Sequence, residues 1–180
     1  LLKFEGGCQG LFSVSRVTTG LGNTLSFVVT GTEGTIRFTS GTAGDVSYSA
    51  DGALIATASR DKSSKVFDAV TGRMLASNSE TAAPVRGATF APDGKSVVSV
   101  GGNGARVWKV EDSTTIGELP PFQGETQAIV SHGENVFAAS ADRSVREFKL
   151  ADRTQVRAFA EHPAWVLSLA VNEPTHRVAT

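Results

Sequence analysis

The fold is decided by residues 49–68, which read SADGALIATASRDKSSKVFD. An Asp-Gly pair opens this stretch, an apolar run follows, and a polar turn then leads into the run Lys65-Val66-Phe67. Apolar runs of four to six residues between turn residues are too short for independent helices and are typical of buried strands. The stretch therefore predicts β-strands joined by tight turns.

The same pattern recurs downstream. Residues 91–109 read APDGKSVVSVGGNGARVWK, and their Asp-Gly pair follows the first one by 42 positions. A looser copy covers residues 135–148, NVFAASADRSVREF, and a fourth begins at residues 161–170, EHPAWVLSLA. Successive aromatic residues near the ends of the first three copies are 41 and 40 positions apart: Phe67, Trp108 and Phe148. A period of this length predicts repeated units of four short strands each.

Glycine-containing turns separate the predicted strands. Pro92-Asp93-Gly94 can form a type I turn with glycine in the left-handed conformation, which closes a hairpin. Gly101-Gly102-Asn103-Gly104 could suggest a phosphate-binding loop, but such loops lead from a strand into a helix. This one leads into the strand that contains Trp108, so a hairpin turn is favoured.

The repeats resemble the WD40 family, whose units of roughly 40–45 residues fold as four-stranded blades of a β-propeller. The matching residues are 58–68, which resemble the family's second turn and third strand, 104–109, and the pair Glu161-His162, which is similar to its Gly-His dipeptide. The resemblance implies an all-β fold of propeller blades, each a four-stranded antiparallel sheet. It implies an incomplete ring of about four blades plus a partial one.

The resemblance also implies a division into units. The whole chain, 1–180, is interpreted as part of a single propeller with units at 10–40 (degenerate), 43–80, 83–122, 124–160 and 161–180 (truncated). Residues 24–30 and 35–38 are predicted to be strands two and three of the first unit, yet Phe38 and Phe67 are only 29 positions apart. Because rings of this family usually have seven or eight blades, we expect a fragment of a longer, bacterial-type protein.

In the WD40 family, a third-strand Trp, a turn Asp, a second-strand Ser or Thr and a His can form a buried hydrogen-bond network. No unit here has all four, so we expect blade stability to depend more on apolar packing. The second unit has Thr57 or Ser59 with Asp61, but it lacks His, and the third has Asn103 at or near the Asp position. The resemblance assigns structural roles in the blades to Asp61, Phe67, Asn103, Trp108, Asp142, Phe148 and His162.

Composition excludes several function classes. The formal net charge is −1, from 17 Lys and Arg against 18 Asp and Glu, so no overall field attracts nucleic acid or an anionic membrane. The single cysteine, Cys8, excludes an internal disulfide, and one thiol does not identify a compartment. No signal peptide or membrane-spanning segment is visible in the sequence.

No catalytic motif is present, and we expect neither enzymatic activity nor a cofactor. Three histidines occur near predicted strand ends: His132, His162 and His176. A zinc site needs three or four convergent ligands, so these histidines are interpreted as structural or solvated, with no metal site.

Basic residues could form a surface for nucleic acid, namely Arg60, Lys62, Arg86, Arg106, Arg143 and Arg146. Acidic residues lie among them, at Asp61, Glu80, Asp142 and Glu147. Alternating charge is typical of a solvated face, so nucleic acid is not the expected partner.

In propellers similar to this one, the second-turn loops and the loops before the first strands form one rim of the disc. The residue before the turn Asp often faces partners there. The resemblance therefore implies a partner-binding rim that includes Arg60, Arg86, Ala141 and Trp165. For Trp165 the alternative is a place between blades, since an aromatic ring also packs well there.

The expected function is a scaffold that binds other proteins or peptides. An alternative is an accessory propeller of a larger enzyme or haem-bearing redox protein, because similar arrays in bacteria are attached to such domains. The sequence contains no Cys-x-x-Cys-His motif, so a covalently bound haem would depend on residues beyond this segment. A third alternative, an enzyme built on the propeller itself, finds no ligand cluster in the sequence.

Overall fold

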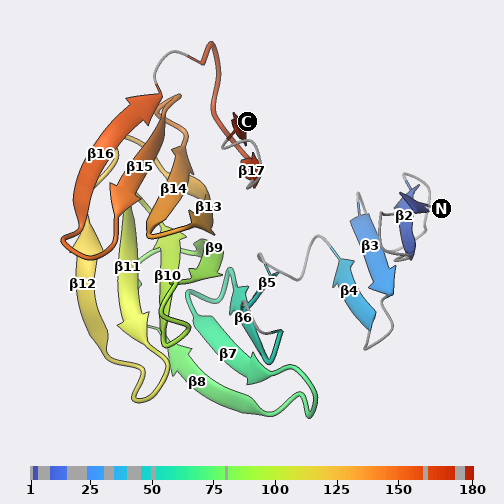
Figure 1. Cartoon of the computed structure of the whole chain (residues 1–180). Helices are drawn as coiled ribbons and strands as arrows, with labels where there is room; N and C mark the ends of the chain where they lie inside the picture. Colours follow the sequence, from blue (N-terminus) through green and yellow to red (C-terminus); the bar gives the residue numbers. More distant parts are fainter. Residues whose placement is uncertain are drawn as a thin grey trace. The chain divides into compact units, whose positions relative to one another are not determined.

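A computed structural model describes residues 2–3, 9–15, 24–30, 35–39, 46–49, 52–79, 81–159, 162–172 and 177–180 (Figure 1). Every regular element in these ranges is a β-strand. Within them, no helix is long and apolar enough to cross a membrane. The chain divides into two compact units, Leu1–Ala43 and Gly44–Thr180, and each is described by itself.

The first unit contains one antiparallel sheet whose strands pair in chain order. Its strands are β1 (Leu2–Lys3), β2 (Gln9–Ser15), β3 (Thr24–Thr30) and β4 (Thr35–Thr39). The prediction for β3 and β4 is therefore wrong, because they are the third and fourth strands rather than the second and third.

This correction explains the short spacing between Phe38 and Phe67. Phe38 lies on a fourth strand, whereas Phe67 lies on a third strand, so the two positions are not equivalent. The third-strand aromatic of the first sheet is Phe27, which precedes Phe67 by 40 positions. The period of 40 to 41 residues therefore also covers the first sheet.

The second unit contains three four-stranded antiparallel sheets and one two-stranded sheet, each made of consecutive strands. The first of them comprises β5 (Val46–Tyr48), β6 (Leu54–Ala58), β7 (Ser64–Asp68) and β8 (Met74–Asn78). The next comprises β9 (Val85–Phe90), β10 (Ser96–Gly101), β11 (Gly104–Lys109) and β12 (Thr115–Leu119). The third comprises β13 (Thr126–His132), β14 (Asn135–Ser140), β15 (Val145–Lys149) and β16 (Thr154–Phe159), and the two-stranded sheet β17 (Ala170–Asn172) and β18 (Arg177–Ala179).

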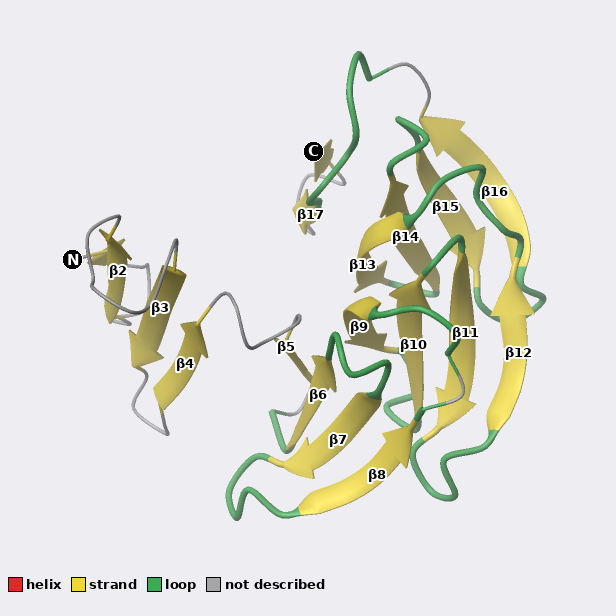
Figure 2. Ribbon diagram, turned by 180° about the vertical axis from the view of Figure 1, so that it is seen from behind, coloured by secondary structure: helices red, strands yellow, loops and turns green. Residues whose placement is uncertain are grey.

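The sheets of the second unit are arranged side by side around their first strands (Figures 1 and 2). β5 contacts β9, β9 contacts β13, and β13 contacts β17, so the first strands are innermost. The hydroxyl groups of Thr89 on β9 and Ser131 on β13 are 3.1 Å apart. This radial order of four-stranded antiparallel sheets is the architecture of propeller blades. The division of the chain into the predicted units, and their membership of one propeller, stay predictions.

The turns after β5 and β9 contain the predicted left-handed glycines. Gly52 has a φ of 72° and Gly94 a φ of 63°, in the region that a side chain disfavours. Asp93 fixes the second turn, because its Oδ1 accepts hydrogen bonds from the backbone N–H groups of Lys95 and Ser96, both at 2.9 Å. Gly52 and the pair Asp93-Gly94 are thus turn residues, whereas Asp51 lies outside the described residues.

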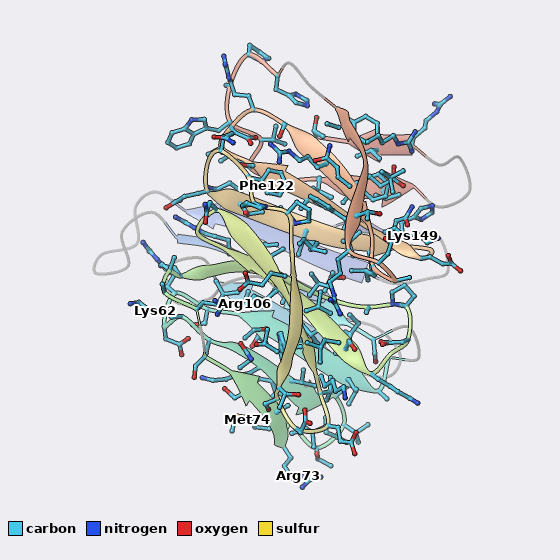
Figure 3. The ribbon with its side chains drawn as sticks, turned by 90° about the vertical axis from the view of Figure 1, so that its left-hand side faces the viewer. Lys62, Arg73, Met74, Arg106, Phe122 and Lys149 are labelled. Atoms are coloured by element: carbon cyan, nitrogen blue, oxygen red, sulfur yellow. The ribbon has the colours of Figure 1, made fainter. Side chains whose placement is uncertain are left out.

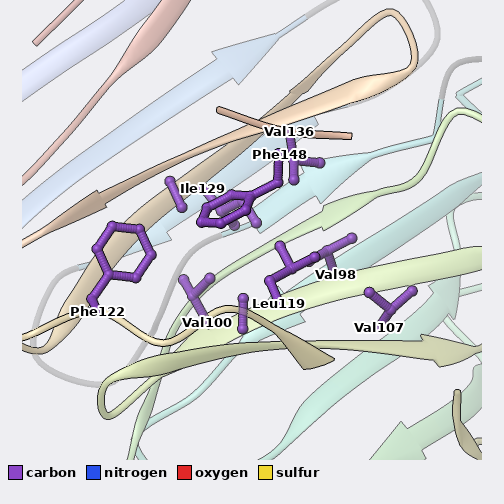
Figure 4. Close-up of a cluster of buried hydrophobic side chains, with 10 residues drawn as sticks. Val98, Val100, Val107, Leu119, Phe122, Ile129, Val136 and Phe148 are labelled. Atoms are coloured by element: carbon purple, nitrogen blue, oxygen red, sulfur yellow. The ribbon is translucent and has the colours of Figure 1, made fainter. Parts of the chain in front are cut away.

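Apolar side chains fill the space between successive sheets. Trp108, on β11, is fully buried in a cluster that includes Ala56 and Val66 from the preceding sheet. Phe148, on β15, is fully buried against Val98 and other residues of the sheet before it (Figure 4). Each of these third-strand aromatics therefore attaches its sheet to the previous one by burial of a large apolar surface.

Truncation of Phe148 should show how strongly the sheets depend on this packing. Phe148→Ala is expected to lower the free energy of unfolding by about 3–5 kcal/mol, because it leaves a cavity between two sheets. The control is Val70→Ala, because Val70 is 92% exposed and its truncation should change stability by less than about 0.5 kcal/mol. Urea denaturation measures both, and equal effects would contradict the packing argument.

Candidate partner-binding rim

One edge of the second unit consists of the loops between second and third strands together with the segments that enter the innermost strands. We call this edge the hairpin rim: residues 59–63, 81–86, 102–103, 120–127, 141–144 and 162–167. Figure 3 shows Lys62 and Phe122 toward this edge and Lys149 toward the opposite one. Equivalent backbone hydrogen bonds connect neighbouring sheets at three places along the hairpin rim. They run from Val85 N to Ser59 O (3.0 Å), from Thr126 N to Gly102 O (2.6 Å) and from Val166 N to Ser140 O (3.3 Å).

The loop between β6 and β7 is fixed by Asp61. Its Oδ1 accepts hydrogen bonds from the backbone N–H of Ser63 at 2.9 Å and from the Ser63 hydroxyl. Its Oδ2 lies 3.2 Å from the Lys65 Nζ. The Ser63 hydroxyl is the main reason that the pKa of Asp61 lies far below its usual value, and its effect exceeds the opposing effect of desolvation.

The loop between β14 and β15 repeats this arrangement with Asp142. Its Oδ1 accepts hydrogen bonds from Ser144, and its Oδ2 accepts one from the backbone N–H of Gln123 at 3.1 Å. Arg146 donates to the same oxygen at 3.1 Å, while its guanidinium lies 4.4 Å from the ring centre of Phe122. Burial raises the pKa of Asp142, but the hydrogen bonds from Ser144 and Gln123 and the charge of Arg146 together lower it.

The loop between β10 and β11 is shorter and has no carboxylate. It contains Gly102, with a φ of 57°, and Asn103. The carbonyl of Asn103 accepts a hydrogen bond from Phe122 N at 2.8 Å, just as the carbonyl of Arg143 accepts one from His162 N at 3.3 Å. The structure therefore places Asn103 at the position equivalent to Arg143, one residue after the Asp.

All four predicted partner-binding residues lie on the hairpin rim. Arg60 is exposed and forms no side-chain hydrogen bond or ion pair with the described residues, and Trp165 is 68% exposed. Arg86 is exposed, but its guanidinium pairs with Glu125 at 3.1 Å. Ala141 is half-buried, and its backbone N–H donates to the carbonyl of Glu125 at 2.8 Å.

The segment around Trp165, where the fourth copy of the repeat begins in the sequence, precedes the first strand of its sheet. Residues 162–169 form a loop, and β17 begins only at Ala170. Val166 is buried, whereas its neighbours Trp165 and Leu167 are 68% and 63% exposed. Leu167 was not predicted as a partner-binding residue. The sequence Trp165-Val166-Leu167 could have indicated it, because in an extended segment alternate side chains point the same way.

Lys62 and Arg143 were also not predicted as partner-binding residues. Both are exposed, and their φ angles of 71° and 70° lie in the left-handed region that favours glycine. They follow Asp61 and Asp142 directly, so the pattern Ser-x-Asp-Lys/Arg-Ser could have identified them in the sequence.

The remaining predicted residues lie on strands or, in the case of His162, in the loop before β17. Phe67 and His162 are half-buried, and His132 lies at the end of β13 beside Phe137. His176 and Cys8 lie outside the described residues. In the part of the chain that the structure describes, no three His, Cys, Asp or Glu side chains form a group that could hold a metal ion.

The fold defines an all-β repeat protein made of four-stranded antiparallel propeller blades. A family model described as "WD domain, G-beta repeat" matches residues 39–68, which include β5, β6 and β7. Residues 39–68 are therefore similar to a WD40 repeat, and WD40 repeats in general serve as platforms for binding other proteins. The search of curated proteins finds no match to the chain.

Substitution of Asp142 and of Asp61 tests how much each aspartate stabilises the fold through its hairpin loop. Asp142 is 9% exposed and accepts hydrogen bonds from two loops, whereas Asp61 is 54% exposed. Asp142→Ala is expected to lower the free energy of unfolding by about 2 kcal/mol, because buried N–H groups lose a charged acceptor. Asp61→Ala should cost clearly less, and urea denaturation at neutral pH compares the two.

The effect of Asp142→Ala should also depend on pH. A carboxylate whose pKa is lowered in the folded state stabilises the fold fully above its unfolded pKa of about 3.9, and this contribution is lost as the pH falls through the folded value. The stability difference between wild type and Asp142→Ala should therefore shrink below about pH 4. An unchanged difference at acid pH would show that the lowered pKa of Asp142 does not stabilise the fold.

Proposed function

We propose that this protein is an interaction scaffold that binds another protein or a peptide on the hairpin rim, without catalysis of its own. The observation that carries the proposal is the exposed pair Trp165 and Leu167, held on either side of the buried Val166. Tryptophan is among the residues most enriched at the energetic centres of protein interfaces. Covering these two side chains would remove a large apolar surface from water.

The rim is well suited to binding because its backbone is held in place before a partner arrives. Val166 N donates to the carbonyl of Ser140, and His162 N donates to that of Arg143, so the segment with Trp165 is attached to the neighbouring hairpin. A preorganised loop loses little conformational freedom on binding. Variable side chains on a rigid scaffold are the usual way in which loops carry function.

The two predicted arginines of the rim differ in how freely they can contact a protein partner. Arg60 is exposed without a side-chain partner among the described residues, and arginine also anchors many interfaces. Arg86 is paired with Glu125, so it has less free charge to offer. We therefore assign the main contacts to Trp165 and Arg60.

Trp165→Ala should weaken partner binding by at least about tenfold, because an exposed aromatic anchor is removed. Arg60→Ala should have a smaller effect in the same direction. The measurement is affinity capture from a lysate of the source cells, followed by titration of the purified partner against each variant. Circular dichroism and thermal melting should remain those of the wild type.

Val70→Ala provides the control, because Val70 is 92% exposed in the turn between β7 and β8, away from the rim. It should bind the partner like the wild type. Equal binding by Trp165→Ala and the wild type would contradict the proposal, as would unfolding of both rim variants. Turnover of a substrate by the intact chain would contradict its non-catalytic part.

A further inference from the structure

The short loop between β10 and β11 leaves a recess in the hairpin rim. The recess has a volume of about 320 Å³ and is lined by the loop Gly101–Gly104, by Thr81 and Ala82, and by the ion pair of Arg106 with Glu118. The loops of the two neighbouring sheets are longer and carry Asp61 and Asp142. The recess therefore lies where the hairpin loop of the sheet β9–β12 lacks both the length and the carboxylate of its neighbours.

Ser99 lines this recess and has an unsatisfied hydroxyl group. The residue is 3% exposed, and its Oγ has no hydrogen-bond partner in the described structure. A buried hydroxyl without a partner is destabilising, and nearly all such groups in native proteins are satisfied. The hydroxyl of Ser99 is therefore an unused donor on a residue that forms part of the wall of the recess.

The charged residues of the hairpin rim are unequally paired. Its carboxylates are all engaged by cations of this chain: Asp61 by Lys65, Glu125 by Arg86 and Asp142 by Arg146. Three further cations have no ion pair with the described residues: Arg60, Lys62 and Arg143. The wall formed by Arg106 and Glu118 is neutral, with an Nε to Oε1 distance of 2.9 Å. The described rim thus carries an excess of positive charge, although the whole chain has a net charge of −1.

Two of these cations occupy strained backbone positions. Lys62 and Arg143 have φ angles of 71° and 70°, where glycine would fit without a steric cost. Strain of this kind is concentrated at functional sites, where the side chain has a use that offsets it. Both side chains are exposed, so their charges are available to a partner of opposite charge.

We infer that the partner of the hairpin rim is an acidic peptide segment, one of whose carboxylate side chains enters the recess and accepts a hydrogen bond from Ser99 Oγ. Neighbouring acidic residues of the peptide lie opposite Lys62 and Arg143. The inference rests on the proposed function and adds the chemistry of the partner. Nucleic acid fits less well, because none of the described residues that line the recess is aromatic and could stack on a base.

The probe is a fluorescein-labelled peptide of alternating Glu and Ser residues, titrated with the full chain and followed by fluorescence anisotropy. Its control is the same peptide with Gln in place of Glu. The Glu peptide should bind at least about tenfold more tightly, and its affinity should fall as the salt concentration rises. Equal affinities for the two peptides would overturn the inference.

Lys62→Gly and Arg143→Gly separate binding from stability. Each variant should weaken binding of the Glu peptide by about three- to tenfold through loss of a charge, while its melting temperature stays the same or rises because the strain is relieved. The matched control is Arg153→Gly, because Arg153 is exposed, has a φ of 59° and lies in the turn between β15 and β16 at the opposite edge. An equal loss of binding in Arg153→Gly would overturn the assignment to the hairpin rim.

Ser99→Ala tests the recess. Removal of an unsatisfied hydroxyl should leave the melting temperature unchanged or raise it, yet weaken binding of the Glu peptide by about tenfold. Unchanged binding would overturn the role of Ser99. Tighter binding of a single-stranded oligonucleotide than of the Glu peptide would overturn the inference in favour of nucleic acid. Partner capture that depends on Trp165 without any binding of the Glu peptide would overturn the inference alone and leave the proposed function standing.

Discussion

One constraint recurs between successive sheets of the second unit: a backbone hydrogen bond from the segment that leads into β9, β13 or β17, on which the rest of that unit depends. Val85, Thr126 and Val166 each donate to the carbonyl at the end of the second strand in the preceding sheet. Because both groups belong to the backbone, the bond fixes the spacing of the sheets whatever the side chains are. The hairpins can therefore differ in length and charge without loss of the radial order.

Apolar packing supplies what the incomplete polar network of the blades does not. Trp108 and Phe148 are fully buried between sheets, and the indole N–H of Trp108 has no hydrogen-bond partner in the described structure. An unsatisfied buried N–H is destabilising, so the apolar surface around it has to compensate. The sequence lacks part of the WD40 hydrogen-bond network, and the structure accordingly leaves the indole N–H of Trp108 unpaired inside a well-packed core.

The sequence was sufficient for the period and the strands, because turn glycines and short apolar runs are local signals. It was insufficient where two strands look alike. Phe27 and Phe38 pair across β3 and β4, and only the sheet order shows which of them belongs to the third strand. Asn103 could be placed only at or near the Asp position, because a shortened loop cannot be aligned from residue types alone. The unsatisfied hydroxyl of Ser99 depends on neighbours far away in the sequence.

The hairpin rim combines features that stability alone does not explain. In its described residues, a left-handed turn position carries Lys62 or Arg143 where glycine would be less strained, and a recess carries a buried serine where alanine would avoid an unsatisfied hydroxyl. Natural proteins tolerate such local costs at sites that bind other molecules. The opposite edge also has a cation in a left-handed backbone conformation, Arg153. The unsatisfied serine, Ser99, in contrast lines the recess of the hairpin rim. The proposal that this edge binds a partner therefore depends on the coincidence of backbone strain, unpaired positive charge and an unsatisfied donor.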